Sequence, residues 1–549
     1  MSIPNSSTLR VTPLGSGLQA FCFAIGALAL PAIAPAQCLT ERISVTPGGS
    51  VPNGDSLRPT VSTDGRYVAF ESNAPDIAPG YAGWNVFVRD RAASVNVVVS
   101  VDSGGAQANG DSKVGAISAD GRFVAFQSAA SDLVGGDTNG VVDIFVRDLQ
   151  AGTTTRVSLD SSGVEGNGDS FIPAITPDGR FIVFLSLADN LVAGDANGKS
   201  DVFVHDRLSG STVVASVTPA GAVGNGNCGG IIYLHQGPSI SADGRFVAFQ
   251  SLASDLVAGD TNGTFDVFVR DLVSGTTRLA SVSSLGIQGN SASEDPAISA
   301  DGRVVAFESF SWNLVPGDTN ASYDVFAHDL QTGETTRLSL SSAGTQANEE
   351  SGRPTISADG RFVAFDSRAS NLIPDDWNGK DDVFVHDRAS GATALASLST
   401  SGLHGEKASW FPSISAGGRF VVFNSSARYL VIPDPMDWQD AFLRDLGPST
   451  LTTYCTAKVN SQGCLPAVSF SGTPSASAPV GFDVTAANVI NDKYGLLFYG
   501  LDSATSPFQG GVLCVQAPIH RTAVQHSAGM PPPDDCSGRF AFDFNAYVQ

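Results

Sequence analysis

Residues 117–128 read ISADGRFVAFQS, and this stretch decides the fold because it recurs along the chain. There are seven copies in all. The turn residue of each copy stands at Asp64, Asp120, Asp178, Asp243, Asp301, Asp359 and, in the last copy, Gly417. The successive spacings are 56, 58, 65, 58, 58 and 58 residues. A period of this length suits four short strands and their loops.

Each repeat is typical of one four-stranded unit. In the copy above, AIS (116–118) ends a first strand, Asp120-Gly121 makes a two-residue hairpin turn, and RFVAF (122–126) begins a second strand. The apolar residues hardly alternate, as in a strand that packs on both faces. DIFVRD (143–148) and TTTRVSL (153–159) follow as strands three and four. We therefore predict an all-β fold, a seven-bladed β-propeller of four-stranded antiparallel blades with a small C-terminal β-module.

Closure of the ring is predicted from the two ends of the repeat region. ERISVT (41–46) is similar to a fourth strand, whereas the seventh repeat reaches DAFLRDL (440–446) without a good one. We expect residues 41–46 to pair with the third strand of blade seven, between Ala441 and Asp445. This pairing leaves no exposed strand edge at that point.

Strand three keeps a phenylalanine and an aspartate in every copy, as in Phe145 and Asp148. We expect the phenylalanine to pack between blades. The aspartate is expected to accept backbone N–H groups in the turn to strand four.

The repeat resembles the WD40-like (PD40) repeats of TolB-type propellers over about residues 47–447. ISADGRFVAFQS followed by DIFVRDLQAG carries the resemblance, and Pro177-Asp178-Gly179 matches the turn of that family. The period near 58 residues is longer than is usual there. The resemblance implies a propeller fold but no single activity, because the family includes periplasmic scaffolds, peptidase side domains and sugar-active enzymes.

Composition agrees with many short strands joined by tight turns, since the chain has 59 glycines, 29 prolines and only 15% charged residues. Lys and Arg total 31 against 54 Asp and Glu, which gives a formal net charge of -23. Nucleic acid is therefore excluded as an expected partner, because phosphate neutralisation needs a basic surface.

The ends of the chain differ from the repeat region. An apolar run at 20–34, followed by Ala34 and Ala36, predicts a cleaved secretory signal over residues 1–36 and a secreted or periplasmic protein. This run is too short for a membrane span, and we expect no transmembrane segment. We place the propeller at 37–450 and a cysteine-containing β-module at 451–549, because four of the six remaining cysteines follow residue 450.

A polar motif, GDTNGVVD (136–143), precedes strand three in five blades and offers three side-chain oxygens each time. Calcium is one candidate ligand, but it takes about 6–8 oxygens, so backbone and water would have to supply the others. The alternative is an Asx-type turn that orients the loop through its own hydrogen bonds. The candidate ligands are Asp137, Asn139, Asp143, Asp195, Asn197, Asp201, Asp260, Asn262, Asp266, Asp318, Asn320, Asp324, Asp376, Asn378 and Asp382.

An insertion before the first strand of blade four carries an apolar cluster of Ile231, Ile232, Tyr233 and Leu234. It is a candidate contact for a partner, and local packing over the channel mouth is the alternative.

The sequence holds no zinc spacing, GxSxG stretch, phosphate loop or dinucleotide fingerprint in the required context. We therefore expect an exported, non-enzymatic and monomeric binding or scaffold module, with a protein or polysaccharide partner on one face and no cofactor other than the candidate calcium. The alternative is a carbohydrate-active or hydrolytic enzyme that uses the propeller channel. The residues that line the channel would distinguish the two.

Overall fold

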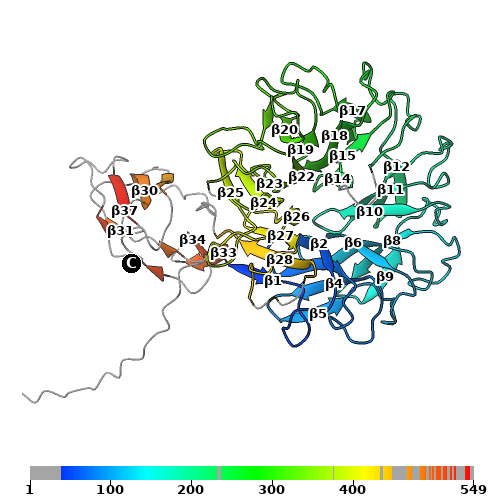
Figure 1. Ribbon diagram of the computed structural model, residues 1–549, viewed down its shortest axis with the longest axis horizontal. Helices are drawn as coiled ribbons and strands as arrows, with labels where there is room; N and C mark the ends of the chain where they lie inside the picture. The colour runs from blue at the N-terminus through cyan, green and yellow to red at the C-terminus, as the bar shows by residue number, and fades with distance from the viewer. Residues whose placement is uncertain are drawn as a thin grey trace, which may run out of the picture. The chain divides into compact units, whose positions relative to one another are not determined.

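The computed structural model describes residues 39–230, 237–374, 376–432, 434 and 437–447, together with nine strands between residues 467 and 543. Between residues 39 and 447 the strands form seven four-stranded antiparallel sheets. Figure 1 shows these sheets around a common axis, in chain order from blue to yellow. The described region is therefore a seven-bladed β-propeller, as the repeats predict.

Each blade runs outward from the axis as strands one to four. Strand one is β2 (Ser56–Val61), β6 (Ser112–Ile117), β10 (Ser170–Ile175), β14 (Ser239–Ile240), β18 (Ser293–Ile298), β22 (Ser351–Ile356) or β26 (Ser409–Ile414). Strand two is β3 (Tyr67–Ser72), β7 (Phe123–Ser128), β11 (Phe181–Ser186), β15 (Phe246–Ser251), β19 (Val304–Ser309), β23 (Phe362–Ser367) or β27 (Phe420–Ser425). Strand three is β4 (Asn85–Asp90), β8 (Asp143–Asp148), β12 (Asp201–Asp206), β16 (Asp266–Asp271), β20 (Asp324–Asp329), β24 (Asp382–Asp387) or β28 (Asp440–Asp445). Strand four is β5 (Val95–Val98), β9 (Thr153–Arg156), β13 (Ser211–Val214), β17 (Thr276–Leu279), β21 (Thr335–Arg337), β25 (Ala392–Leu395) or, in blade seven, β1 (Thr40–Arg42).

Antiparallel pairing gives the propeller two different faces. The loops between strands two and three, and the start of strand one, lie on what we call the loop face. The connections between strands one and two, and between strands three and four, lie on the opposite turn face.

Aromatic pairs fill the space between blades. Phe126 of β7 and Phe145 of β8 stack with ring centroids 5.7 Å apart, and the corresponding pair recurs in every blade. Both rings are fully buried and pack against Val86 and Val88 of blade one. The expectation that the strand-three phenylalanine packs between blades is confirmed, and burial on both faces explains the lack of alternation.

The connection between strands one and two differs from the two-residue Asp-Gly hairpin expected from the sequence. Five residues, 118–122, separate β6 from β7. The Asp120 carboxylate accepts the Ser118 hydroxyl at 2.6 Å and the Arg122 N–H at 3.0 Å, so it closes a longer turn. Gly121 has φ of 74°, and a Cβ there would lie 2.1 Å from the Tyr67 ring of the preceding blade. Glycine is therefore required for both the backbone conformation and the contact between blades.

A salt bridge ties strands two and three together in every blade. In blade two, Arg122 Nε and Nη2 donate to Asp148 Oδ1 and Oδ2 at 3.0 and 2.8 Å. All seven blades have this pair. Asp148 also accepts the N–H groups of Gln150 and Ala151, which confirms its predicted turn role. The hydrogen bonds from Arg122 hold the pKa of Asp148 at about 2.

The N-terminal segment closes the ring as predicted. Strand β1 pairs antiparallel with β28, and Thr40, Glu41 and Arg42 lie opposite Arg444, Leu443 and Phe442. The strand begins one residue earlier than expected and ends at Arg42, although the Ile43 N–H still donates to Ala441 O at 2.8 Å. Arg42 also forms salt bridges with Asp434 and Asp440.

Beyond the propeller the described strands form small antiparallel sheets. The largest has three strands, β29 (Ala467–Gly472), β30 (Phe482–Val489) and β37 (Gly538–Asp543). The other pairs join β31 (Tyr494–Gly495) to β36 (Gln525–His526), β32 (Phe498–Tyr499) to β35 (His520–Arg521) and β33 (Ser503–Phe508) to β34 (Gly511–Val515). The predicted boundaries of this module stay predictions. No membrane-spanning helix occurs in the part of the chain that the structure describes.

Candidate functional site

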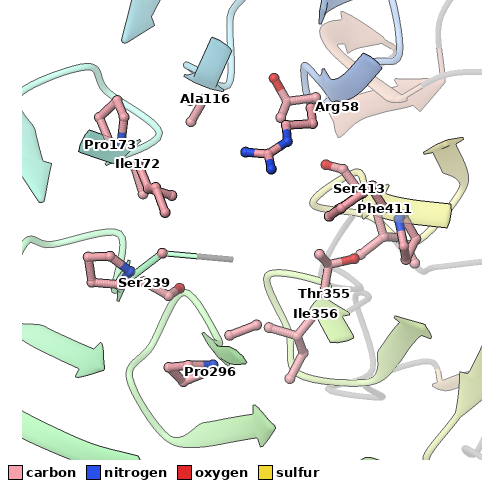
Figure 2. A pocket seen from close by; sticks show the side chains of 18 of the residues that line it. Arg58, Ala116, Ile172, Pro173, Ser239, Pro296, Thr355, Ile356, Phe411 and Ser413 are labelled. Atoms are coloured by element: carbon pink, nitrogen blue, oxygen red, sulfur yellow. The ribbon is translucent and has the colours of Figure 1, made fainter. Parts of the chain in front are cut away.

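A cavity of about 300 Å³ lies on the propeller axis, and the first strands of all seven blades line it. Figure 2 shows side chains converging on it from every side. Proline, alanine, isoleucine, serine and threonine make up most of the lining. Of the described residues that line it, only Arg58 carries a charge, and Figure 2 shows its guanidinium pointing into the space.

Strained backbone surrounds this cavity near the loop face. In five blades the residue before the strand-one proline has a φ between 50° and 52°, and none of these residues is glycine. They are Arg58, Ile172, Asp295, Arg353 and Phe411. Strands one and two shift register at this point, as a β-bulge requires. Each such residue costs roughly 1–2 kcal/mol relative to ordinary backbone, and strain of this kind concentrates at functional sites.

Side chains from the preceding blade hold the strained residues in place. The Ile172 N–H donates to Gln127 Oε1 at 2.8 Å, and the Asp295 N–H donates to Gln250 Oε1 at 2.7 Å. These acceptors occupy one position of strand two, between the constant phenylalanine and serine. The residues at that position are Glu71, Gln127, Leu185, Gln250, Glu308, Asp366 and Asn424. The phenylalanine and serine on either side are the same in all seven blades. The blade fold therefore does not dictate which residue stands between them.

The most polar part of this ring lies between blades five and seven. Glu308 Oε2 accepts the Arg353 N–H at 2.7 Å, and Asp366 Oδ2 accepts Arg353 Nε at 2.9 Å and the Phe411 N–H at 3.2 Å. Burial raises the pKa of Asp366 to about 6, against the opposing effect of Arg353. Burial, together with Asp295, also raises the pKa of Glu308.

Phe411 lies between two arginines. The guanidinium carbons of Arg58 and Arg353 lie 5.2 and 5.1 Å from the centre of its ring. Both distances are within the range of a cation–π contact, so the ring positions two positive charges beside the axis.

Two hydroxyl groups in the cavity wall have no hydrogen-bond partner among the described residues. They are Oγ1 of Thr60 and Oγ1 of Thr355, and both atoms are buried. A buried polar atom without a partner indicates a group or water that completes it. The wall offers a cation, the hydroxyl groups of Ser239 and Ser413, and apolar proline and phenylalanine faces.

The structure places the polar-loop residues away from this cavity, beside strand three. In each of the five loops the asparagine Oδ1 accepts the backbone N–H two residues later, which is the Asx-type turn. The amide nitrogen of the same asparagine donates to a carbonyl of the connection to the next blade. These contacts form the Asx-type turn in all five loops.

The carboxylates of these loops differ from blade to blade. In blade two Arg156 lies 3.1, 3.2 and 2.9 Å from Asp137, Asp143 and Glu165. In blade four Gln288 Nε2 donates to Asp260 at 2.7 Å and to Asp266 at 2.8 Å. No cluster of three or more histidine, cysteine, aspartate or glutamate side chains suited to a metal ion occurs among the described residues. Calcium at these loops stays a prediction.

Residues 231–236 lie outside the described part of the chain, so the predicted contact at Ile231, Ile232, Tyr233 and Leu234 is untested. The same holds for the signal segment. Sequence reasoning missed Arg58 and Phe411, although their position varies among the repeats beside a constant proline. That contrast between varying and constant positions was the available signal.

No protein-family model matches the chain, and no curated protein matches it. Several solved structures are similar in fold. An oligogalacturonate lyase in complex with manganese covers 75% of this chain with 96% of its own length, at 14% identity and a TM-score of 0.45. The β-propeller domain of the Trilobed protease from Pyrococcus furiosus covers 73% with 96% of its length, at 12% identity and a TM-score of 0.44. A putative TolB from Agrobacterium tumefaciens covers 53% with 94% of its length, at 16% identity and a TM-score of 0.32.

These comparisons correct one expectation. The sequence led us to expect that the protein is not an enzyme, but the solved structures similar to it include oligogalacturonate lyases. Absence of a familiar motif is therefore no ground for excluding catalysis, and that expectation is withdrawn. At these identities the likeness extends to the propeller fold, which TolB-like proteins and a protease domain share.

Proposed function

We propose that the protein binds a small hydroxylated carboxylic acid, of the sugar-acid type, in the axial cavity. The observation that carries the proposal is the guanidinium of Arg58, which is the charged group among the described residues of the cavity wall. The chain as a whole has a net charge of -23, so a positive charge at this point is contrary to its general composition.

The chemistry of the wall supports this class of ligand. A guanidinium binds a carboxylate through two parallel hydrogen bonds, and this pairing is strong where water is scarce. Ser239 and Ser413 in the wall carry hydroxyl groups that can donate to and accept from ligand hydroxyls. The volume of about 300 Å³ lies at the small end of ligand pockets, which suits a single sugar-sized ring.

Calorimetric titration tests the proposal. A monomeric uronic acid is titrated into the wild-type protein, beside the neutral sugar with the same ring. We expect the acid to bind and the neutral sugar to bind much more weakly. Arg58→Ala should weaken binding of the acid by about tenfold or more, since hydrogen bonds to charged groups contribute roughly 1.5–3 kcal/mol.

Arg278→Ala is the matched control, because Arg278 is exposed on the outer strand β17 of blade four. This variant should bind the acid as the wild type does. Equal binding of acid and neutral sugar, or unchanged binding by Arg58→Ala, contradicts the proposal. Chemical analysis of the ligand recovered after incubation then establishes whether the bound molecule is also converted.

A further inference from the structure

All five tryptophans of the chain lie in one sector of the propeller. Four are in loops between strands two and three, namely Trp84 in blade one, Trp312 in blade five, Trp377 in blade six and Trp438 in blade seven. The fifth, Trp410, is in the first half of β26. These positions belong to four consecutive blades and to the loop face. We call them the tryptophan sector.

Three of these side chains are strongly exposed. Trp312 is 66% exposed, Trp377 is 68% exposed and Trp438 is 40% exposed. Tryptophan is highly buried on average, because leaving its large apolar surface in water is unfavourable. Exposed tryptophan on neighbouring blades of one face therefore indicates a contact surface.

The blade does not need tryptophan at these positions. The residue that corresponds to Trp312 in blades two to four is Ser131, Asp189 or Ser254. The residue that corresponds to Trp377 is Thr138, Ala196 or Thr261. Small and polar residues thus suffice for the same loop in the same chain, so the aromatic side chains require another explanation.

Charged and polar groups lie next to two of these rings. Beside Trp438, the Asp437 carboxylate accepts Arg428 Nε at 2.8 Å and also pairs with Lys407. Beside Trp377, the Asn378 side chain is held within its own loop, where its amide nitrogen donates to Asp382 and its Oδ1 accepts the Lys380 backbone N–H. The core of a protein interface is usually depleted of charged residues, whereas a charged group lies directly beside Trp438, and the exposed rings of Phe310 and Tyr429 add aromatic surface to the same loops.

We infer that the tryptophan sector binds a polysaccharide chain. A pyranose ring has an apolar C–H face that stacks on an aromatic ring, and hydroxyl edges that need both donors and acceptors. Exposed aromatic rings on neighbouring blades, with charged groups beside Trp438, match that chemistry over several sugar units. The net charge of -23 opposes binding of a nucleic acid strand, which also stacks on aromatic rings. The inference is independent of the axial site.

Affinity electrophoresis in native gels tests this inference. The gels contain a soluble neutral glucan, a galactomannan or an alginate. We expect at least one polymer to retard the full-length wild-type protein. Single changes of Trp312, Trp377 or Trp438 to alanine should weaken binding about fivefold or more, and the triple variant should lose the retardation. Trp377→Phe should retain a large part of it, since a smaller aromatic ring still stacks.

Leu208→Ala and Val273→Ala are matched controls, because these side chains are 78% and 76% exposed but lie on the turn face. Both should be retarded like the wild type. The melting temperature of each variant shows that it is folded. The inference is wrong if no polymer retards the wild type, if the triple variant is retarded equally, or if a protein ligand alone engages these tryptophans. Arg58→Ala should leave the retardation unchanged, which separates this surface from the axial site.

Discussion

Arg58 combines two unfavourable features, a left-handed backbone at φ 50° and a charge beside the apolar axis. The left-handed backbone recurs at Ile172 and Phe411 and so belongs to the bulge of the repeat, whereas the side chain at this position varies from blade to blade. The stacking of the Arg58 guanidinium on Phe411 of the neighbouring blade holds this charge beside the axis.

Glycine at position 58 should therefore separate stability from binding. Glycine usually destabilises a strand by about 0.5–1 kcal/mol relative to alanine, but left-handed backbone reverses this preference by roughly 1–2 kcal/mol. We expect Arg58→Gly to be more stable than Arg58→Ala by about 1 kcal/mol in urea unfolding, while neither variant binds the sugar acid. If Arg58→Gly is the less stable of the two, the strain at this position is not real.

At the scale of elements, the polar loop of blade two is held together by Arg156. Its guanidinium lies among three carboxylates, and the Asp143 side chain is fully buried. Blade three has Val214 at the position of Arg156, and burial raises the pKa of Asp201 there to about 6. The two loops therefore form a natural comparison.

Arg156→Leu should destabilise the protein by about 3 kcal/mol, because it leaves buried carboxylates without their cation. The free energy of unfolding in urea at neutral pH measures the effect. Val214→Arg is the reciprocal change, and it should lower the pKa of Asp201, which NMR titration can follow. A loss below about 0.5 kcal/mol for Arg156→Leu would be typical of an exposed pair and would contradict this account.

The strands of the propeller were predicted from the sequence better than the residues of the axial site. The repeat predicts blades, the phenylalanine pairs and the closing strand, because each is required seven times and leaves a period in the sequence. The predicted length of the turn at Asp120 was wrong, since that length depends on side-chain hydrogen bonds that the repeat period does not reveal. The axial site was missed because its residues come from seven separate repeats and each differs from its counterparts.

At the scale of the whole molecule, buried carboxyl groups should make stability depend on pH. Burial raises the pKa of Asp266 to about 6 and that of Asp382 and Asp440 to about 7. These values are above those of the unfolded chain, so between about pH 4 and pH 7 the folded state binds more protons. Stability therefore falls as the pH rises through that window.

The salt bridges act in the opposite sense but at lower pH. The pKa of Asp148 and of Asp329 is held at about 2 by Arg122 and Arg303, so their contribution is lost only as the pH falls below about 4. We expect the highest melting temperature near about pH 4 and a lower one at about pH 8. Scanning calorimetry in low and high salt measures this, since salt screens surface repulsion but not the buried groups. A flat profile in high salt would contradict the role of the buried carboxyls.

Closure of the ring is the other property of the whole molecule, because it joins residues about 400 positions apart through β1 and β28. A chain that begins at Gly48 lacks β1 and the Arg42 salt bridges with Asp434 and Asp440. It leaves Asp440 buried without its cation and exposes the edge of β28. A chain that begins at Leu39 retains all of these contacts and is the control.

We expect the shorter chain to melt at least about 10 °C lower, since losing one buried ion pair alone costs about 3–5 kcal/mol. It should also associate through the open edge in sedimentation experiments. Equal melting of the two chains would show that the ring is held by blade packing alone.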